Sequence, residues 1–597
     1  MGLVGLRYQI PQKMSKITIS TFFTLFLCLS VFAQRQNLWK ASSNFAAKTA
    51  IEQSKGIKKA SFLELDEDAF LLMLQSGGLM TPRSTQKITV DLPVGAGKTE
   101  TFELMRSEVM HPDLALKYPE IASFEGVSRD TRGKAVFISI YKKQIHLLVS
   151  GERTYYLDPI KGFSGVYVLY DRSDYPLQAD NDFRCHVEDL GELVADEEPQ
   201  GNVQYRNSTD ARLRRYDLAV ACTSEYTAYH GNTVAGALAA INTTVTRVNS
   251  VFRRELAIIF QLVSNNDRLI YRNNVNIDTP ADPDPYDNYD GSQMLGINTS
   301  NINGIITSAA YDVGHVFSTG GGGIAAVGPC TTTKGNGVTG IVTPEFDPFD
   351  IDYVCHEIGH QFSAGHTQNN SCQRSAAAAY EPGSGSTIMG YAGICPPNIQ
   401  GNSDPYFHSI SIQQITTQVA GHACDTETVI TNSEPTIVTA VPDYTIPIST
   451  PFSLTASFTD ADNDPLLYCW EQFNNGTTSG TMPPQSTSTD RPNFRSFSPT
   501  SSPTRVFPNL NDLINNVTPT WEVLPSVART MNFRVTARDY NIAGGQTNQD
   551  NVVITVGTAG PFRVTSPNSS GVIWYVGESR TITWDVNLTN TATYSLN

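Results

Sequence analysis

Alternating apolar and polar residues indicate strands in the first third of the chain. Residues 135–141 (Ala-Val-Phe-Ile-Ser-Ile-Tyr) and 144–150 (Gln-Ile-His-Leu-Leu-Val-Ser) have this pattern. Further along, an apolar strand at 216–222, a helix near 233–252 and an apolar strand at 256–263 follow one another. Because a strand-helix-strand unit makes a right-handed crossover, we expect an α/β domain with a mixed, mostly parallel sheet at 211–427.

Beyond residue 428 the helical periodicity disappears. Short runs rich in Thr, Ser and Val are broken by proline, for example at 454–458, 466–470 and 531–537. They predict an all-β, immunoglobulin-like sandwich at 428–558. A second module of this kind is expected at 559–597, and because so short a stretch cannot complete a sandwich, we expect the sequence to be truncated there.

The first residues predict export. Two lysines precede an apolar run at 17–33 that is too short to span a membrane comfortably and ends in Val-Phe-Ala. We expect a signal peptide at 1–33, cleaved after Ala33, with Met14 as an alternative start. No later stretch approaches a transmembrane helix, so the mature protein is predicted to be secreted and extracellular, or held at the cell surface by other means.

Composition agrees with export. A net charge of −16 argues against a nucleic-acid partner, which needs a concentrated basic face. Of 9 cysteines, Cys28 would leave with the signal peptide, and the others suit an oxidising compartment. Connectivity does not follow from the sequence; a pair of Cys222 with Cys355 would leave Cys469 alone.

The chemistry is concentrated in Tyr-Val-Cys-His-Glu-Ile-Gly-His-Gln-Phe-Ser-Ala-Gly-His-Thr at 353–367. On a helix, His356 and His360 lie one turn apart on the same face and can hold one ion together with His366. Three neutral ligands leave Zn²⁺ an open position for water, and Glu357 is placed to act as the general base. A structural zinc site is disfavoured, because such sites are normally closed by a fourth Cys or His.

These residues resemble the metzincin metallopeptidases, whose zinc motif is followed by a Met-turn. The second part is present as Ser-Thr-Ile-Met-Gly-Tyr at 386–391. The resemblance implies that Met389 forms an apolar floor beneath the ligands without binding metal. Tyr391 occupies the position of a tyrosine that approaches zinc in astacin-like and serralysin-like members. It is either an oxyanion donor or a packed aromatic.

The chain departs from the family pattern at one position. Ser363 stands where the family has a glycine that turns the chain after the helix, and Gly365 comes two residues later. Either Ser363 adopts a left-handed conformation, at a cost of ~1 kcal/mol, or the turn uses Gly365. Glu381 is the rival third ligand, but the proline and glycines after it argue against a helix there, so His366 is preferred.

Upstream, 314–319, a four-glycine run and the segment to Cys330 resemble the edge strand and loop of reprolysin-type metzincins. An exposed edge can bind an extended protein or peptide substrate as an added strand. His315 lies on this strand and is not counted as a ligand. The resemblance also implies two disulfides, Cys330–Cys424 and Cys372–Cys395.

Residues 34–210 resemble an α+β propeptide of such enzymes, with processing expected near the acidic stretch 196–201. Cys185 is the one cysteine of this segment. Its thiolate could fill the open zinc position and keep a zymogen inactive, or it could be a buried thiol or part of a bridge.

Two Asp-rich stretches raise the question of Ca²⁺. The stretch 278–290 lacks a recognisable calcium-loop spacing and is better interpreted as a solvated turn. Asp460, Asp462 and Asp464 resemble turns of cadherin-like modules, where calcium and a polar hairpin turn are both open.

Together these patterns predict a secreted, zinc-dependent metalloendopeptidase made as a zymogen, inhibited by its own propeptide. The alternative is an extracellular adhesion or matrix-binding protein with a vestigial peptidase domain, which the intact Glu357 disfavours. A zinc amidase acting on a small substrate is disfavoured by the resemblance at the strand edge.

Overall fold

The computed structural model describes residues 38–95, 97–175, 185, 208–272, 275–276, 283–476, 482–591 and 593–594. The predicted signal peptide, the processing tract at 196–201 and residues 278–282 of the first Asp-rich stretch lie outside the described residues. From Trp39 onward the chain forms one compact unit. None of the helices in the described ranges is both long and apolar enough to cross a bilayer.

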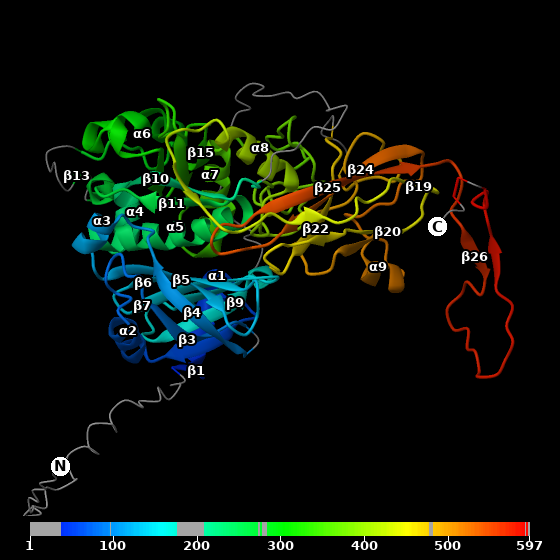
Figure 1. Ribbon diagram of the computed structural model, residues 1–597, viewed down its shortest axis with the longest axis horizontal. Coiled ribbons are helices and arrows are strands. Elements are labelled where there is room, and N and C mark those ends of the chain that lie inside the picture. The colour runs from blue at the N-terminus through cyan, green and yellow to red at the C-terminus, as the bar shows by residue number, and fades with distance from the viewer. Residues whose placement is uncertain are drawn as a thin grey trace, which may run out of the picture. The chain divides into compact units, whose positions relative to one another are not determined.

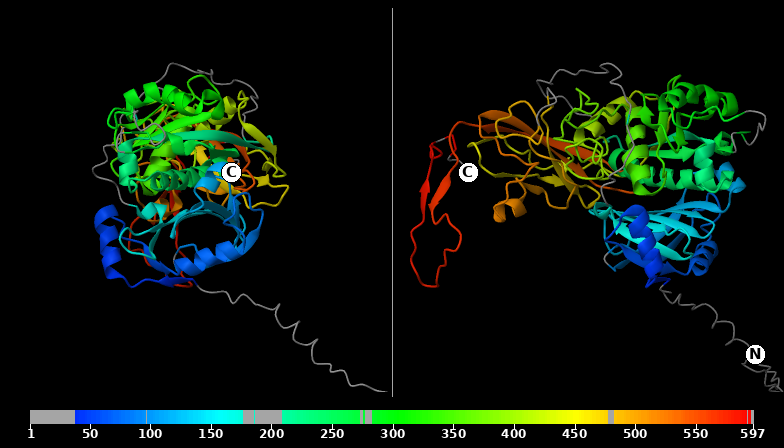
Figure 2. Two further views of the ribbon diagram at one scale, coloured as in Figure 1. Left: turned by 90° about the vertical axis from the view of Figure 1, so that its left-hand side faces the viewer. Right: turned by 180° about the vertical axis from the view of Figure 1, so that it is seen from behind.

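The N-terminal module (39–175) is built on one antiparallel sheet of nine strands in the order β1-β2-β9-β8-β7-β6-β5-β4-β3, which curls into a half-barrel (Figures 1 and 2). The predicted strands at 135–141 and 144–150 are confirmed as β6 and β7. The helices are α1 (Phe45–Lys55), α2 (Glu67–Ser76) and α3 (Pro112–Lys117). The strands are β1 (Trp39–Ala41), β2 (Ser61–Leu65), β3 (Lys87–Pro93), β4 (Thr99–Ser107), β5 (Ile121–Ser128), β6 (Ala135–Tyr141), β7 (Gln144–Ser150), β8 (Tyr155–Pro159) and β9 (Val166–Asp171).

The middle of the chain forms a six-stranded sheet in the order β11-β10-β14-β16-β15, with β17 added to β10. β10 is parallel to β11 and β14, and β14 is parallel to β16, so the predicted mostly parallel sheet is confirmed. Only β15 and β17 pair antiparallel. The strands are β10 (Arg212–Cys222), β11 (Ile258–Leu262), β14 (Val313–Ser318), β15 (Gly322–Ala325), β16 (Gly337–Gly340) and β17 (Thr426–Val429).

The expected crossover helix is α5 (Val234–Leu256), which follows the short α4 (Ser224–Tyr229) and begins after Thr233. The Thr233 hydroxyl caps it by accepting a hydrogen bond from the Gly236 N–H. α5 packs on β11 and also on β5, β6 and β7 of the N-terminal module. A helix enclosed in this way buries polar residues that would otherwise face water.

Two charged residues of α5 are buried against other parts of the chain. The Arg247 guanidinium donates to Asp158 of β8 (2.6 Å) and to Asp350 (2.9 Å). Near the end of the helix, Glu255 accepts from Arg538 (2.8 Å) and from the Tyr540 hydroxyl (2.9 Å), with the Glu255 and Arg538 side chains fully buried. α5 is therefore joined by ion pairs to modules on both sides of it in the sequence.

The prediction for the edge strand is wrong. The strand that carries His315 is β14, which lies between β10 and β16. The glycine run at 320–323 reverses the chain, so that β15 pairs antiparallel with β16 and becomes the edge of the sheet. His315 is buried between Gln361 and Thr339, as expected of a residue that is not a metal ligand.

The C-terminal part contains an all-β module around a core of Trp470, Phe494, Phe507 and Phe533. Its largest sheet has the order β19-β25-β24-β22, with β20–β23 and β18–β21 as two-stranded sheets. These strands are β18 (Thr436–Ile437), β19 (Tyr444–Ile446), β20 (Phe452–Thr455), β21 (Phe458–Thr459), β22 (Leu467–Gln472), β23 (Thr504–Phe507), β24 (Arg529–Arg538) and β25 (Thr547–Val556). A separate hairpin, β26 (Arg563–Ser566) and β27 (Thr583–Asp585), follows.

Both disulfides that the resemblance implied are present, Cys330–Cys424 and Cys372–Cys395. The pairing of Cys222 with Cys355 is wrong, because each remains a buried thiol. Burial raises the pKa of the Cys222 thiol to about 12, and its sulfur lies 3.4 Å from the Thr227 hydroxyl. These cysteines serve as small core residues.

Candidate metal centre

The first two histidines of the motif lie on α7 (His356–Gln361), which continues directly from a π-helical stretch at Pro348–Cys355. The helix ends at Phe362, and Ser363 adopts a left-handed conformation with φ of 75°. Of the two turns that the sequence left open, the chain uses the one at Ser363. This turn brings His366 back toward the helix.

The three imidazoles converge through their Nε2 atoms. His360 Nε2 lies 2.9 Å from His356 Nε2 and 2.9 Å from His366 Nε2. Each Nδ1 lies 2.7 Å from a backbone carbonyl oxygen, that of Ile388, Ala364 or Gln373. Because a carbonyl can only accept a hydrogen bond, each Nδ1 must carry the proton, and each Nε2 presents a lone pair.

Three lone pairs at this separation cannot hydrogen-bond to one another and fit a shared cation instead. Burial lowers the pKa of His356 to about 4 and that of His366 to about 3, so both rings are neutral at physiological pH. The pKa of His360 is lowered for the same reason, with further contributions from its two neighbours. Neutral imidazoles with Nδ1–H bonded to carbonyls are a typical ligand set for Zn²⁺.

The Cys185 thiol completes this cluster. Its sulfur lies 3.6 Å from His360 Nε2 and 3.5 Å from His366 Nε2. Cys185 and the three histidines are buried, and their ligand atoms all lie within 4.8 Å of one another. The Cys185 backbone also forms an isolated parallel bridge with Gly323 on the edge strand β15.

Glu357 is fully buried beside the cluster. Burial raises the pKa of its carboxyl to about 8, and a contact with the Cys185 thiol offsets part of the rise. A carboxyl whose pKa lies near neutrality can both accept and return a proton. Removing the thiol and admitting water would change this environment.

The Met-turn lies directly against the helix. Met389 is fully buried, and a Cβ added at Gly359 of α7 would lie 2.5 Å from its sulfur, so a larger residue at this position would force the Met389 side chain to shift. The Tyr391 ring lies 4.5 Å from the His366 ring, between centroids. The Tyr391 hydroxyl donates to Gln373 Oε1 (2.6 Å) and to the Cys185 carbonyl (3.3 Å).

Sequence reasoning missed Gln373, which contacts the site twice. Its backbone oxygen holds His366 Nδ1 and its side chain holds Tyr391. The only feature of the sequence that could have indicated a role for Gln373 is its position beside Cys372. Glu381, the rival ligand, lies outside the metal-ligand cluster, and its carboxylate accepts hydrogen bonds from Thr367 and Ser386 instead.

The calcium expectations find no support. Within the described part of the chain, Cys185 and the three histidines are the only group of three or more His, Cys, Asp or Glu side chains that lie close enough to hold one metal ion. Asp460 Oδ1 accepts backbone hydrogen bonds from Asp462 and Asp464, both at 2.9 Å, as in a polar turn. Asp290 caps α6 (Gly291–Ile306).

Comparison with known proteins agrees with this geometry. The family model for metallo-peptidase family M12B, reprolysin-like, matches residues 213–426. A comparison with curated proteins gave no match. The matched region contains the three histidines, Glu357, the Met-turn and both disulfides, whereas Cys185 and the C-terminal module lie outside it.

Proposed function

We propose which residues of this chain carry out its activity. Residues 213–426 are a reprolysin-like M12B metallopeptidase domain, and the chain is a zinc metalloendopeptidase acting on proteins. His356, His360 and His366 hold the zinc ion, and Glu357 is the general base. The observation that carries the assignment is the convergence of three Nε2 lone pairs, each fixed by an Nδ1–H bond to a carbonyl. Because the ring protons lie on Nδ1, the short distances between the Nε2 atoms are not hydrogen bonds between the rings.

Each group of the site has a separate role in the reaction. A bound zinc ion supplies Lewis acidity and a water that is nucleophilic at neutral pH. Glu357 takes a proton from the attacking water and delivers it to the nitrogen of the leaving amine. Tyr391, once Cys185 has left, donates its hydroxyl to the oxygen that gains charge. The edge strand β15 aligns the extended substrate by backbone hydrogen bonds.

We further propose that the chain is a secreted, latent precursor. In this proposal residues 1–33 are the signal peptide, 34–210 the propeptide, 211–427 the catalytic domain, and 428–558 and 559–597 immunoglobulin-like modules. Cys185 keeps the precursor inactive, because its thiol lies among the histidines while its backbone pairs with β15. It thus covers both the metal centre and the edge proposed for substrate. Two disulfides fit an exported protein.

The roles of the site residues are tested by metal content together with activity. Glu357→Gln should retain zinc while kcat falls by ~10²-fold or more, because the carboxylate moves protons without ligating. Alanine at His356, His360 or His366 should remove the metal, whereas Glu381→Ala should weaken zinc binding without abolishing it. If His366→Ala binds zinc normally, the ligand set is wrong. Tyr391→Phe should lower kcat and leave KM unchanged if the hydroxyl stabilises the oxyanion.

Latency is tested in the uncleaved chain with a small peptide substrate. Cys185→Ser should raise activity, because a serine hydroxyl stays protonated and is a far weaker zinc ligand than a thiolate. Cys222→Ser is the matched control, since that thiol is also buried but lies outside the cluster. If Cys185→Ser stays as inactive as the parent while propeptide removal activates both, inhibition is by occlusion alone.

A further inference from the structure

We propose that the C-terminal module is part of the catalytic unit, because Ser496 and Glu471 of that module position the segment that carries His366 and Met389. The inference rests on the proposed roles of His366 as a zinc ligand and of Met389 as the apolar floor beneath the ligands. It assigns Glu381, Ser496 and Glu471 as positioning residues, none of which touches the reacting atoms.

The segment that needs positioning has little structure of its own. Residues 362–408, all of which the structure describes, contain neither a helix nor a strand between α7 and α8 (Ser409–Val419). One isolated bridge joins Gln368 to Glu381, and one disulfide closes a loop. A metal ligand on such a segment keeps its place only if other parts of the protein fix the backbone.

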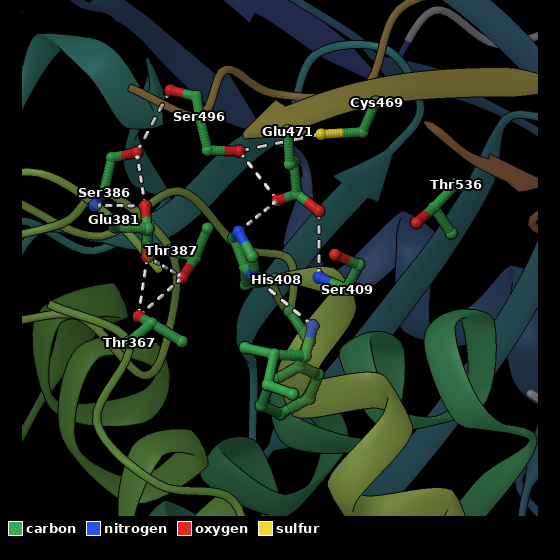
Figure 3. Close-up of polar contacts among 12 residues, drawn as sticks. Thr367, Glu381, Ser386, Thr387, His408, Ser409, Cys469, Glu471, Ser496 and Thr536 are labelled. Atoms are coloured by element: carbon green, nitrogen blue, oxygen red, sulfur yellow. Dashed lines mark hydrogen bonds and ion pairs between the residues drawn. The ribbon is translucent and has the colours of Figure 1, made fainter. Parts of the chain in front are cut away.

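Glu381 is the centre of the first set of contacts (Figure 3). Its Oε2 accepts from the hydroxyls of Thr367 (2.6 Å) and Thr387 (2.5 Å). Its Oε1 accepts from the Ser386 backbone N–H at 2.9 Å. Thr367 directly follows the third histidine, and its N–H donates to the Met389 carbonyl at 3.0 Å. One buried carboxylate therefore ties the third ligand to the Met-turn.

The network continues into the C-terminal module. The Ser386 hydroxyl is shared between Glu381 Oε1 (3.1 Å) and the Ser496 carbonyl (3.2 Å). The Ser496 hydroxyl donates to Glu471 Oε1 (2.8 Å) and accepts from Tyr406 (2.7 Å). Figure 3 shows the path from Thr367 through Glu381, Ser386 and Ser496 to Glu471.

Glu471 anchors the far end of the path. It is fully buried on β22, and its Oε2 accepts from the Ser409 N–H (2.9 Å) at the start of α8. Burial by itself would raise the pKa of this carboxyl, but His408 and Arg538 outweigh it and lower the pKa, so Glu471 is ionised at neutral pH. A charge-assisted acceptor of this kind makes stronger hydrogen bonds than a neutral one.

The module also contacts the preceding turn of the segment. A Cβ at Gly383 would lie 2.6 Å from the Trp521 ring, which therefore packs directly on this backbone. The Gly476 N–H donates to the Ala379 carbonyl at 2.9 Å. The rings of Tyr380 and Phe473 stack with centroids 4.4 Å apart. The module thus holds the segment by several contacts, and the hydrogen-bonded path is the one that reaches the metal ligand.

The test uses the full chain and a pair of variants that differ by one hydroxyl. Ser496→Thr keeps the donor to Glu471, and Ser496→Val replaces it with a methyl group of the same shape. We expect Ser496→Val to weaken Zn²⁺ affinity about tenfold in competition with a chelator, the lower range for loss of groups that support a metal ligand. It should also alter the visible spectrum of the Co²⁺-substituted protein. Ser496→Thr should restore both.

Activity of the activated enzyme adds a second readout. Loss of positioning should lower kcat and leave KM near the parent value, because the substrate edge β15 is not in the network. Thr455→Val, at an exposed position of β20 in the same module, is the control and should change nothing. Glu471→Gln is the second variant should Ser496→Val fail to fold, and it should show the same losses.

Equal Zn²⁺ affinity and equal Co²⁺ spectra in Ser496→Val, Glu471→Gln and the parent would overturn the inference. That failure is distinct from failure of the proposed function. If His366→Ala loses zinc while these variants keep it, the ligand assignment stands and only the role of the C-terminal module is wrong. If His366→Ala keeps zinc, the ligand assignment itself is wrong.

Discussion

Asp158 offers a direct measure of how strongly the N-terminal module is attached to α5. Burial alone would raise the pKa of its carboxyl, but the Arg247 guanidinium and His146 outweigh it and lower the pKa from 3.8 to about 2. This lowering of the pKa corresponds to ~2–3 kcal/mol of stability at neutral pH. Asp158→Asn keeps the shape of the side chain and removes the charge, so it should lower the stability of this module by that amount.

The sign of the effect fixes its pH dependence. Because the folded pKa lies below the unfolded one, the contribution is complete above pH ~4 and is lost as the pH falls through ~2. The free-energy difference between the parent and Asp158→Asn should therefore shrink to about half by pH 3. Urea unfolding followed by pulse proteolysis of the N-terminal module at pH 7 and pH 3 measures both values.

A surface ion pair in the same module provides the control. Asp68 lies 2.8 Å from Lys143, with both side chains more than half exposed. Solvent screens such an exposed pair, so Asp68→Asn should shift the urea midpoint little. If Asp158→Asn costs no more than Asp68→Asn at pH 7, or costs as much at pH 3 as at pH 7, the ionised carboxylate does not hold the module.

Three further predictions concern α7 and the segment 362–408 that follows it. Ser363→Gly should stabilise the protein by ~0.5 kcal/mol, because relief of the left-handed strain exceeds the entropy that glycine adds to the unfolded chain. Ser363→Val should destabilise the protein. A higher melting temperature for Ser363→Val than for Ser363→Gly would contradict the turn assignment. Gly359→Ala should cost ~1–3 kcal/mol through overlap with Met389, and an unfolding midpoint equal to that of the parent would refute the close packing. Replacing Cys372 and Cys395 by serine should remove ~3 kcal/mol of stabilisation and speed hydrogen exchange between them; unchanged exchange would show that the loop is held without the disulfide.

The local parts of the site could be predicted from the sequence. His356 and His360 are placed by the period of one helix, and His366 follows after a single turn, so one short stretch of chain contains all three histidines of the cluster. Both disulfides, Cys330–Cys424 and Cys372–Cys395, were implied by the family resemblance and not by the sequence alone. The role of Glu357 stays a prediction until the variants are measured.

The features that failed depend on contacts between distant residues. The edge strand was misassigned because the reversal at 320–323 lets a later segment, β16, pair on both sides. A bond between Cys222 and Cys355 was considered because a cysteine count contains no distances. Ser496 and Glu471 carried no signal, since polar residues in a β-rich module are normally on its surface. Only the assembled chain shows that they are buried against the metal-ligand segment.

The ion pair between Glu255 and Arg538 can form only late in the synthesis of the chain. Its partners are 283 residues apart, so at ~5–20 residues per second the ribosome delivers Arg538 about 15–60 s after Glu255. During that interval the Glu255 carboxylate has the neighbouring Arg254 at 3.7 Å but lacks Arg538, its second charged partner in the folded chain. The end of α5 that carries Glu255 therefore reaches its final, fully buried packing only after β24 has been synthesised.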